Sequence, residues 1–144
     1  MRLVGIREVE KAMSDIDKTL AKKTWAVVGA SENKEKFGCK IFRYLDRTGD
    51  YKVYPVNPGL TQVFGHKCYA SVKDLPEKPD VVNVVVPPKA GEQVMRDCAD
   101  AGIECVWLQP GADPPAVADL GKELGLGVIK ACVLAEGRKR GIGD

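Results

Sequence analysis

The sequence predicts an α/β protein of the Rossmann-like, doubly wound type, with a mostly parallel sheet of five to six strands and helices on both faces. Short apolar runs and amphipathic stretches alternate about five times along the 144 residues, which is the pattern of βαβ units. Several of the apolar runs are rich in valine, as expected for strands buried on both faces, and three of them end at Gly29, Pro87 or Pro110. Neither a repeat nor a linker interrupts the pattern, so we expect one such domain.

Composition describes an ordinary globular protein and excludes several classes. Apolar residues make up 44% of the chain and charged residues 29%, which is typical of a domain with a buried core. The formal net charge of +2 is too small to indicate a nucleic-acid partner. No apolar run approaches the ~20 residues that span a bilayer, and the charged N-terminus does not match a signal peptide. We therefore expect neither nucleic acid nor a membrane as partner.

The cysteines and the histidine limit the chemistry. Five cysteines occur without a C-x-x-C pair, which argues against a zinc site or a disulfide framework and favours the reducing cytoplasm. His66 is the only histidine, so a catalytic triad or a His-ligated metal would depend on it alone. Its place in the loop "VFGHKC" favours an exposed loop residue. The expected location is cytoplasmic.

Residues 1–23 are predicted to form an amphipathic helical extension before a domain that spans residues 24–144. Within residues 6–22, apolar side chains recur at spacings of three and four, as on one face of a helix. These are Ile6, Val9, Met13, Ile16 and Leu20. We expect this face to pack on the domain or on a partner.

The remaining elements follow in order. Buried strands are predicted at residues 26–29, 52–56, 81–86, 105–109 and 126–132. Residues 57–65 are predicted to form a loop, which is followed by a short edge strand at 67–69 and then by one helical turn. Helices are predicted around Ile41, Phe42 and Leu45, ended by Gly49, then over 89–102, and then over 113–125 with Asp113 as N-cap. The tail from Glu136 is Gly-rich and basic, and no element is predicted there.

Ligands of open parallel sheets bind outside the carboxyl ends of the strands, so the residues that follow each strand are the candidates. The first such loop does not spell G-x-G-x-x-G. Gly29 supplies the turn, Ser31 and Lys34 stand where the second and third glycines would be, and Gly38 comes late. The Ser31 hydroxyl and the amides that begin the helix can face a phosphate. Lys34 and Lys36 add positive charge, or else they are only solvated surface lysines.

The second strand ends in Asn57-Pro58-Gly59, where an NAD site would place a carboxylate for the ribose. No G-x-x-x-x-G-K-[ST] sequence is present, so ATP cleavage has no support. NAD and ATP are therefore disfavoured as ligands.

Six segments follow one another in the order of a known family: "VVGAS…FG…IFRYL", "YKVYPVNPGL", "VFGHKCYASVKDLP", "DVVNVVVPP", "ECVWLQPGA" and "GLGVIKAC". Over about residues 24–132 the chain resembles the small stand-alone coenzyme A-binding proteins. That family is similar to the N-terminal Rossmann-like domain of the succinyl-CoA synthetase α subunit. The resemblance implies coenzyme A (CoA) as the cofactor.

The resemblance also implies which residues surround CoA. Gly29, Ala30 and Ser31 match the family's first phosphate loop, and Asn57 and Pro58 match the end of the second strand. Val86, Pro87 and Pro88 are expected to flank adenine or pantetheine, and Gln109 and Pro110 lie in the following loop. Cys132 matches a cysteine that usually follows Asp-Arg, but Lys130-Ala131 precede it here, which removes any role of that Arg.

Two thiols are candidates for redox chemistry. Cys39 lies at a predicted helix start beside Lys36 and Lys40, where a thiolate is favoured, and CoA itself ends in a thiol. A mixed disulfide with CoA is therefore a hypothesis for Cys39, and Cys132 is a second candidate. The preferred interpretation of Cys39 is a small buried residue.

The residues show no acid–base pair, and the chain has no room for the phosphorylatable histidine and nucleotide-grasp domain of a synthetase. We therefore expect non-catalytic binding of CoA or acyl-CoA and not an enzyme. One alternative is a small NADP-dependent reductase whose lysines bind the 2′-phosphate. Another is a protein-interaction module with a vestigial pocket. The sequence leaves open a homo-oligomer or a larger enzyme complex, and it does not identify an acyl group.

Overall fold

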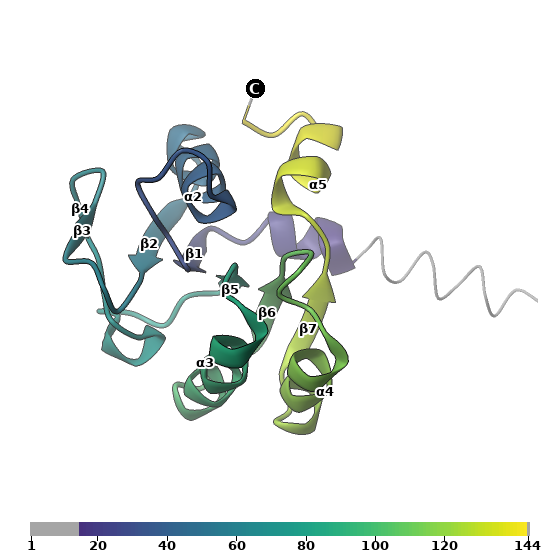
Figure 1. The fold of residues 1–144 in the computed structure, drawn as a ribbon. Helices are drawn as coiled ribbons and strands as arrows, with labels where there is room; N and C mark the ends of the chain where they lie inside the picture. Colours follow the sequence, from purple (N-terminus) through teal and green to yellow (C-terminus); the bar gives the residue numbers. More distant parts are fainter. Residues whose placement is uncertain (1–14, 144) are drawn as a thin grey trace, which may run out of the picture.

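A computed structural model describes residues 15–143 and confirms the predicted Rossmann-like α/β fold (Figure 1). Its main sheet has five strands in the order β2-β1-β5-β6-β7, and every neighbouring pair is parallel. The strands are β1 (Thr24–Val28), β2 (Lys52–Val56), β5 (Val81–Val84), β6 (Cys105–Leu108) and β7 (Gly127–Lys130).

The helices cover both faces of the sheet. Helices α2 (Phe37–Arg47) and α5 (Val133–Lys139) lie on one face, and α3 (Pro88–Asp100) and α4 (Pro115–Glu123) lie on the other (Figure 1). Helices α2, α3 and α4 each connect one strand to the next strand of the sheet, and all strands are parallel, so they all end at the same edge of the sheet. This arrangement places every strand-end loop on one side of the molecule.

Two apolar cores lie on the two faces because side chains alternate along each strand. Trp25 and Trp107 face α2 and α5, with ring centroids 5.8 Å apart, and both are fully buried. Val82 and Met95 belong to the core under α3 and α4. Burying one such side chain stabilises the fold by about 1.5–3 kcal/mol.

Several predicted elements differ from the structure at their ends. Pro88 begins α3, since a proline is tolerated in the first turn of a helix, where its missing N–H has no helical partner. Asp113 was predicted to cap α4, and this is wrong: Pro114 is the N-cap residue. The Asp113 carboxylate instead accepts a hydrogen bond from the Gly111 amide at 3.1 Å.

The tail contains a helix that the sequence did not predict. Helix α5 buries Val133, Leu134 and Gly137, so only one turn of this short helix carries an apolar face. The surrounding glycines and basic residues hid the pattern. The tail is therefore part of the folded domain and not an irregular end.

The segment between β2 and β5 is a small irregular extension. Strands β3 (Gln62–Val63) and β4 (His66–Lys67) form a two-stranded antiparallel sheet that begins within the predicted loop and ends just after it. Of the predicted edge strand over 67–69, Lys67 lies in β4 and Tyr69 forms one parallel bridge with Val56. A 3-10 turn, η1 (Val72–Asp74), confirms the predicted helical turn.

The N-terminal helix is described only in part. Residues 15–20 are helical, and Leu20 and Ile16 pack against the core under α2 and α5. Ile6, Val9 and Met13 lie outside the described residues, so the helical extension over 1–23 stays a prediction. Within residues 15–143, no helix has both the length and the apolar character needed to cross a membrane.

Candidate functional site

The sheet has its topological switch point between β1 and β5, because the chain leaves β1 toward β2 on one side and later returns to β5 on the other. Open parallel sheets bind ligands at this point, beyond the carboxyl ends of the strands. A cleft of about 510 Å³ lies there. It is bounded by the loops that follow β1, β2, β5 and β6.

Two glycines, Gly29 and Gly38, lie in close contact at the turn after β1. Gly29 has a φ of +101°, and a Cβ atom on it would lie 2.6 Å from the carbonyl oxygen of Val85. A Cβ atom on Gly38 would lie 1.9 Å from the carbonyl oxygen of Gly29. Gly38 thus allows helix α2 to touch the end of β1, which is the task of the third glycine in a dinucleotide loop.

The loop between these glycines folds on its own polar side chains. The Ser31 Oγ accepts a hydrogen bond from the Asn33 amide at 2.9 Å, and the Asn33 Oδ1 accepts one from the Glu35 amide at 3.0 Å. Lys36 is the N-cap residue of α2, and no side chain caps the helix. The start of α2 lines the cleft, so the positive end of the helix dipole and the first amides, which no side chain caps, lie at the cleft.

The end of β2 is joined to this loop. Asn57 donates a hydrogen bond from Nδ2 to the Ala30 carbonyl oxygen at 2.9 Å, and its Oδ1 accepts one from the Gly59 amide at 2.8 Å. An uncharged amide thus stands where a ribose-binding carboxylate would be in an NAD site.

The opposite wall depends on Gln109, which is 3% exposed. Its Oε1 accepts hydrogen bonds from the Val133 amide at 2.8 Å and from the Asn83 Nδ2 at 3.3 Å. This side chain therefore links the cleft loop after β6 with the start of α5. Within residues 15–143 the buried Asn83 Oδ1 has no hydrogen-bond partner.

The structure brings most of the predicted site residues together in the cleft. Those that line it are Gly29, Ser31, Lys36, Gly38, Asn57, Val86, Pro87, Gln109 and Pro110. The sequence analysis did not select five further lining residues: Glu35, Phe37, Val85, Gly111 and Ala112. Phe37 is 54% exposed, and its position between Lys36 and Gly38 was the one signal in the sequence that it lies outside the core.

The other predicted residues lie elsewhere. Ala30 is buried behind the loop, and Pro88 is exposed in the first turn of α3. Lys34 lines a separate groove beside α2. Pro58 lines an apolar pocket of about 230 Å³, which shares Val86 with the cleft. The cleft and this pocket are thus neighbours.

The five cysteines are all unbridged in the structure. Cys39 is only 1% exposed, in agreement with a small buried residue, and Cys132 is half-buried at the start of α5. Burial raises the pKa of Cys98 to about 12, with the charge of Asp97 as a second cause. Burial also raises the pKa of Cys68 and Cys105. Within residues 15–143, no three His, Cys, Asp or Glu side chains are grouped as a metal site would require.

Fold and cleft together define a Rossmann-like domain with a glycine turn at its switch point. The family described as "CoA binding domain" matches residues 23–138. The chain belongs to this CoA-binding domain family, and the resemblance found in the sequence is confirmed.

Known relatives include parts of larger enzymes. The chain is 40% identical over 83 residues to the α subunit of acetate–CoA ligase (ADP-forming) II of Pyrococcus furiosus, covering 58% of this chain and 18% of that protein. It is 36% identical over 104 residues to acetate–CoA ligase (ADP-forming) II of Archaeoglobus fulgidus, covering 71% of this chain and 16% of that protein. The chain thus spans less than a fifth of these ligases.

Solved structures similar to this chain include one protein of comparable size and one much larger protein. A hypothetical protein from Pyrococcus horikoshii OT3 superposes with a TM-score of 0.82 at 33% identity, covering 88% of this chain and 90% of that one. An acetyl-coenzyme A synthetase of Ca. Korarchaeum cryptofilum superposes with a TM-score of 0.67 at 30% identity, covering 77% of this chain and 26% of that one. The fold therefore occurs both alone and within a ligase.

Proposed function

We propose that this domain binds CoA or an acyl-CoA non-covalently in the cleft between β1 and β5, without catalysing a reaction by itself. The observation that carries the proposal is the cleft itself, where the glycine turn and uncapped α2 meet Asn57 at the end of β2. This combination suits a pyrophosphate and lacks the carboxylate that binds the ribose of NAD.

The pyrophosphate of CoA is assigned to the turn of Gly29 and Ser31. There the amides at the start of α2 and the Lys36 ammonium supply hydrogen-bond donors and positive charge. Gly29 has no side chain between the backbone and the phosphates, which allows the close approach that such a turn requires.

An uncharged part of CoA, either adenine or pantetheine, is assigned to the apolar pocket beside the cleft. Val28, Val56, Val72 and Val94 line this pocket together with Pro58. Because the pocket shares Val86 with the cleft, one extended ligand can occupy both. Burial of an apolar group there contributes about 25 cal/mol per Å².

The reductase alternative receives little support from the cleft. A reductase needs a group that can donate a proton to the substrate, such as a placed Tyr or His. The described lining of the cleft contains neither, and Glu35 is its only ionisable group besides Lys36. Binding of NADP in preference to CoA remains the result that would revive this alternative.

Calorimetric titration of the full chain with CoA, acetyl-CoA, NADP and NAD tests the proposal. We expect saturable binding of CoA and weaker or no binding of both dinucleotides. Ser31→Trp should abolish CoA binding by filling the cleft, whereas Glu123→Trp, exposed at the end of α4, should leave it unchanged. Absence of CoA binding in the unaltered protein would refute the proposal.

The non-catalytic part needs its own assay. The chain, incubated with acetate, CoA and ATP, is expected to form neither acetyl-CoA nor ADP, although its larger relatives are named as ADP-forming ligases. ADP formation above that of the Ser31→Trp variant would show that the domain alone is an enzyme.

A further inference from the structure

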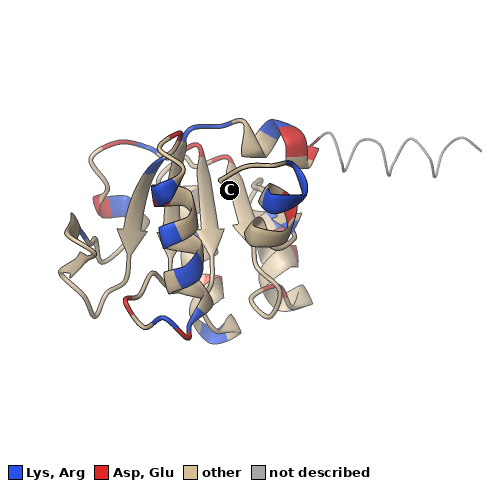
Figure 2. Cartoon of the chain, turned by 90° about the horizontal axis from the view of Figure 1, so that it is seen from above, with Lys and Arg blue, Asp and Glu red and all other residues tan. Residues whose placement is uncertain are grey.

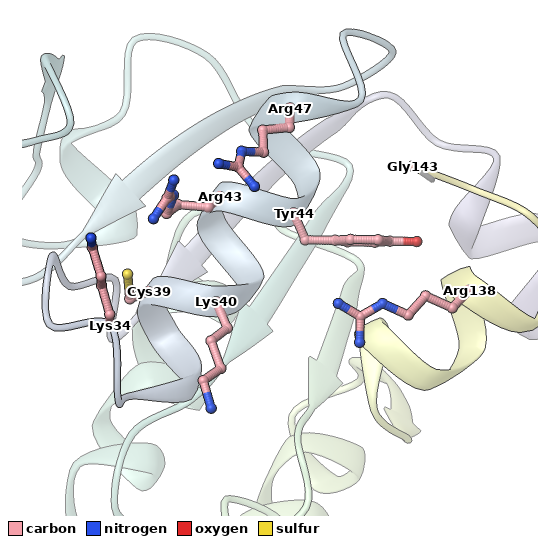
Figure 3. Close-up of a pocket in the computed structure, with 8 residues that line it drawn as sticks. All are labelled: Lys34, Cys39, Lys40, Arg43, Tyr44, Arg47, Arg138 and Gly143. Atoms are coloured by element: carbon pink, nitrogen blue, oxygen red, sulfur yellow. The ribbon is translucent and has the colours of Figure 1, made fainter.

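A second concave site, which we call the basic groove, lies between α2 and the C-terminal segment (Figure 3). Its volume is about 260 Å³, and among residues 15–143 no Asp or Glu lines it. Three parts of the chain supply its positive charge. The loop before α2 contributes Lys34, α2 contributes Lys40, Arg43 and Arg47, and α5 contributes Arg138. Neither the cleft nor the fold explains this concentration of charge.

Helix geometry gathers three of these side chains in one row. Lys40, Arg43 and Arg47 follow one another at spacings of three and four residues, so they share one face of α2. Figure 2 shows them as successive blue bands along α2, with α5 beside them. Like charges at these spacings destabilise a helix, so the row lowers the stability of α2 unless an anion offsets it.

The aromatic ring of Tyr44 joins the two walls of the groove. It reaches from α2 toward α5 (Figure 3), and its hydroxyl donates a hydrogen bond to the Ile142 carbonyl oxygen. The guanidinium of Arg138 lies 5.6 Å from the ring centroid. A Cβ atom on Gly143 would approach the ring to 2.9 Å, so the C-terminal segment is packed closely and the groove has a defined shape.

Most of the charge in the groove lacks a carboxylate partner. Among residues 15–143, no Asp or Glu oxygen lies within 4.0 Å of the side-chain nitrogens of Lys34, Lys40, Arg43 or Arg47. By contrast, Arg140 on the neighbouring turn has Glu136 at 2.8 Å. These four cations thus have no carboxylate partner among the described residues and can pair with an external anion.

We propose that the basic groove binds a small phosphate anion of the size of inorganic phosphate or pyrophosphate. Guanidinium groups match phosphate oxygens in pairs of parallel hydrogen bonds, and α2 offers Arg43 and Arg47 in the groove. Pockets for drug-sized ligands are about 300–1,000 Å³, so a volume of about 260 Å³ favours a smaller ion. The site is separate from the proposed CoA cleft.

Calorimetric titration with pyrophosphate and with inorganic phosphate, at constant ionic strength, tests this site. The double variant Arg43→Ala/Arg47→Ala should weaken pyrophosphate binding at least tenfold, because each lost charged hydrogen bond is worth that factor or more. Arg96→Ala serves as the matched control, since Arg96 is an exposed arginine on α3, across the sheet. It should leave the affinity unchanged.

Ser31→Trp separates this site from the CoA cleft. The basic groove predicts that this variant still binds pyrophosphate, while Arg43→Ala/Arg47→Ala still binds CoA. If Ser31→Trp loses pyrophosphate binding while Arg43→Ala/Arg47→Ala keeps it, the anion binds in the cleft and the proposal is overturned. Absence of pyrophosphate and phosphate binding, with binding of single- or double-stranded DNA, would also overturn it and identify a polyanion surface.

Discussion

Gly38 lies so close to Gly29 that a Cβ atom on Gly38 would stand 1.9 Å from the Gly29 carbonyl oxygen. The start of α2 is therefore fixed against the end of β1 by two residues without side chains. This contact determines where the first amides of α2 point. Any added atom must move the backbone that faces the ligand cleft.

Gly38→Ala is therefore expected to destabilise the protein by about 1–3 kcal/mol, the usual cost of overpacking a tight contact. It should also weaken CoA binding, since the helix start must shift. Urea denaturation and calorimetry measure the two effects. Gly59→Ala is the control, because its Cβ atom would meet only Asn57 Oδ1 at 3.4 Å. Equal effects of both substitutions would contradict the importance of the Gly29–Gly38 contact.

The two lysines of the first loop are expected to act at different sites. Lys36 lines the cleft and Lys34 the basic groove, although the sequence assigned both to CoA. Lys36→Glu should weaken CoA binding at least tenfold by replacing a favourable charge with a repulsive one. Lys34→Glu should change CoA affinity by less than threefold and should weaken pyrophosphate binding instead. A reversed order in the two titrations would show that the lysines are assigned to the wrong ligands.

Gln109→Leu removes the acceptor shared by the Val133 amide and the Asn83 side chain. Leaving buried donors without partners costs about 1–3 kcal/mol, and we expect a loss of that size in the free energy of unfolding. Gln93→Leu, on the exposed side of α3, should stay within about 0.5 kcal/mol of the unaltered protein. A Gln109→Leu protein of unchanged stability would mean that water replaces the lost acceptor.

Burial of the Cys98 thiol is expected to lower the free energy of unfolding as the pH rises into the alkaline range. Its pKa is about 12 in the folded protein and 9.0 for an ordinary thiol, so the unfolded chain loses this proton first as the pH rises. The contribution is fully present below about pH 9 and decreases above it, with a slope of up to about 1.4 kcal/mol per pH unit. In Cys98→Ala this part of the slope should disappear between pH 9 and 11. Urea denaturation under reducing conditions measures it, and parallel curves for both proteins would contradict the assignment.

The sheet and the cleft were predictable from the sequence because buried parallel strands leave a strong local signal. The valine runs at β1 and β5, and the Gly29, Pro87 and Pro110 that come shortly after β1, β5 and β6, identify both the strands and the edge at which they end. The rule that ligands bind at that edge then selects residues such as Gly29, Ser31, Asn57 and Gln109. The positions of the strand ends, together with the family resemblance, thus located most of the lining.

Other features could not be predicted because they depend on contacts between residues that the sequence pattern does not show. Helix α5 was missed because its packing against Tyr44 comes from a distant part of the chain. Lys34 and Lys36 are two residues apart, and only the fold of the loop between Ser31 and α2 sends them to different sites. Asp113 is a residue type that often caps helices, but its carboxylate accepts a hydrogen bond from the Gly111 amide and does not cap α4.

The strand order has a consequence for the speed of folding. The neighbour of β1 on one side, β2, is the next strand in the chain, but its neighbour on the other side, β5, comes much later. Closing that long loop costs entropy before the pairing of Trp25 with Val81 offsets it. We therefore expect Val82→Ala to slow refolding, whereas Val128→Ala, in the edge strand β7, should mainly accelerate unfolding. In stopped-flow measurements, an unchanged refolding rate for Val82→Ala would indicate that the centre of the sheet assembles after the rate-limiting step.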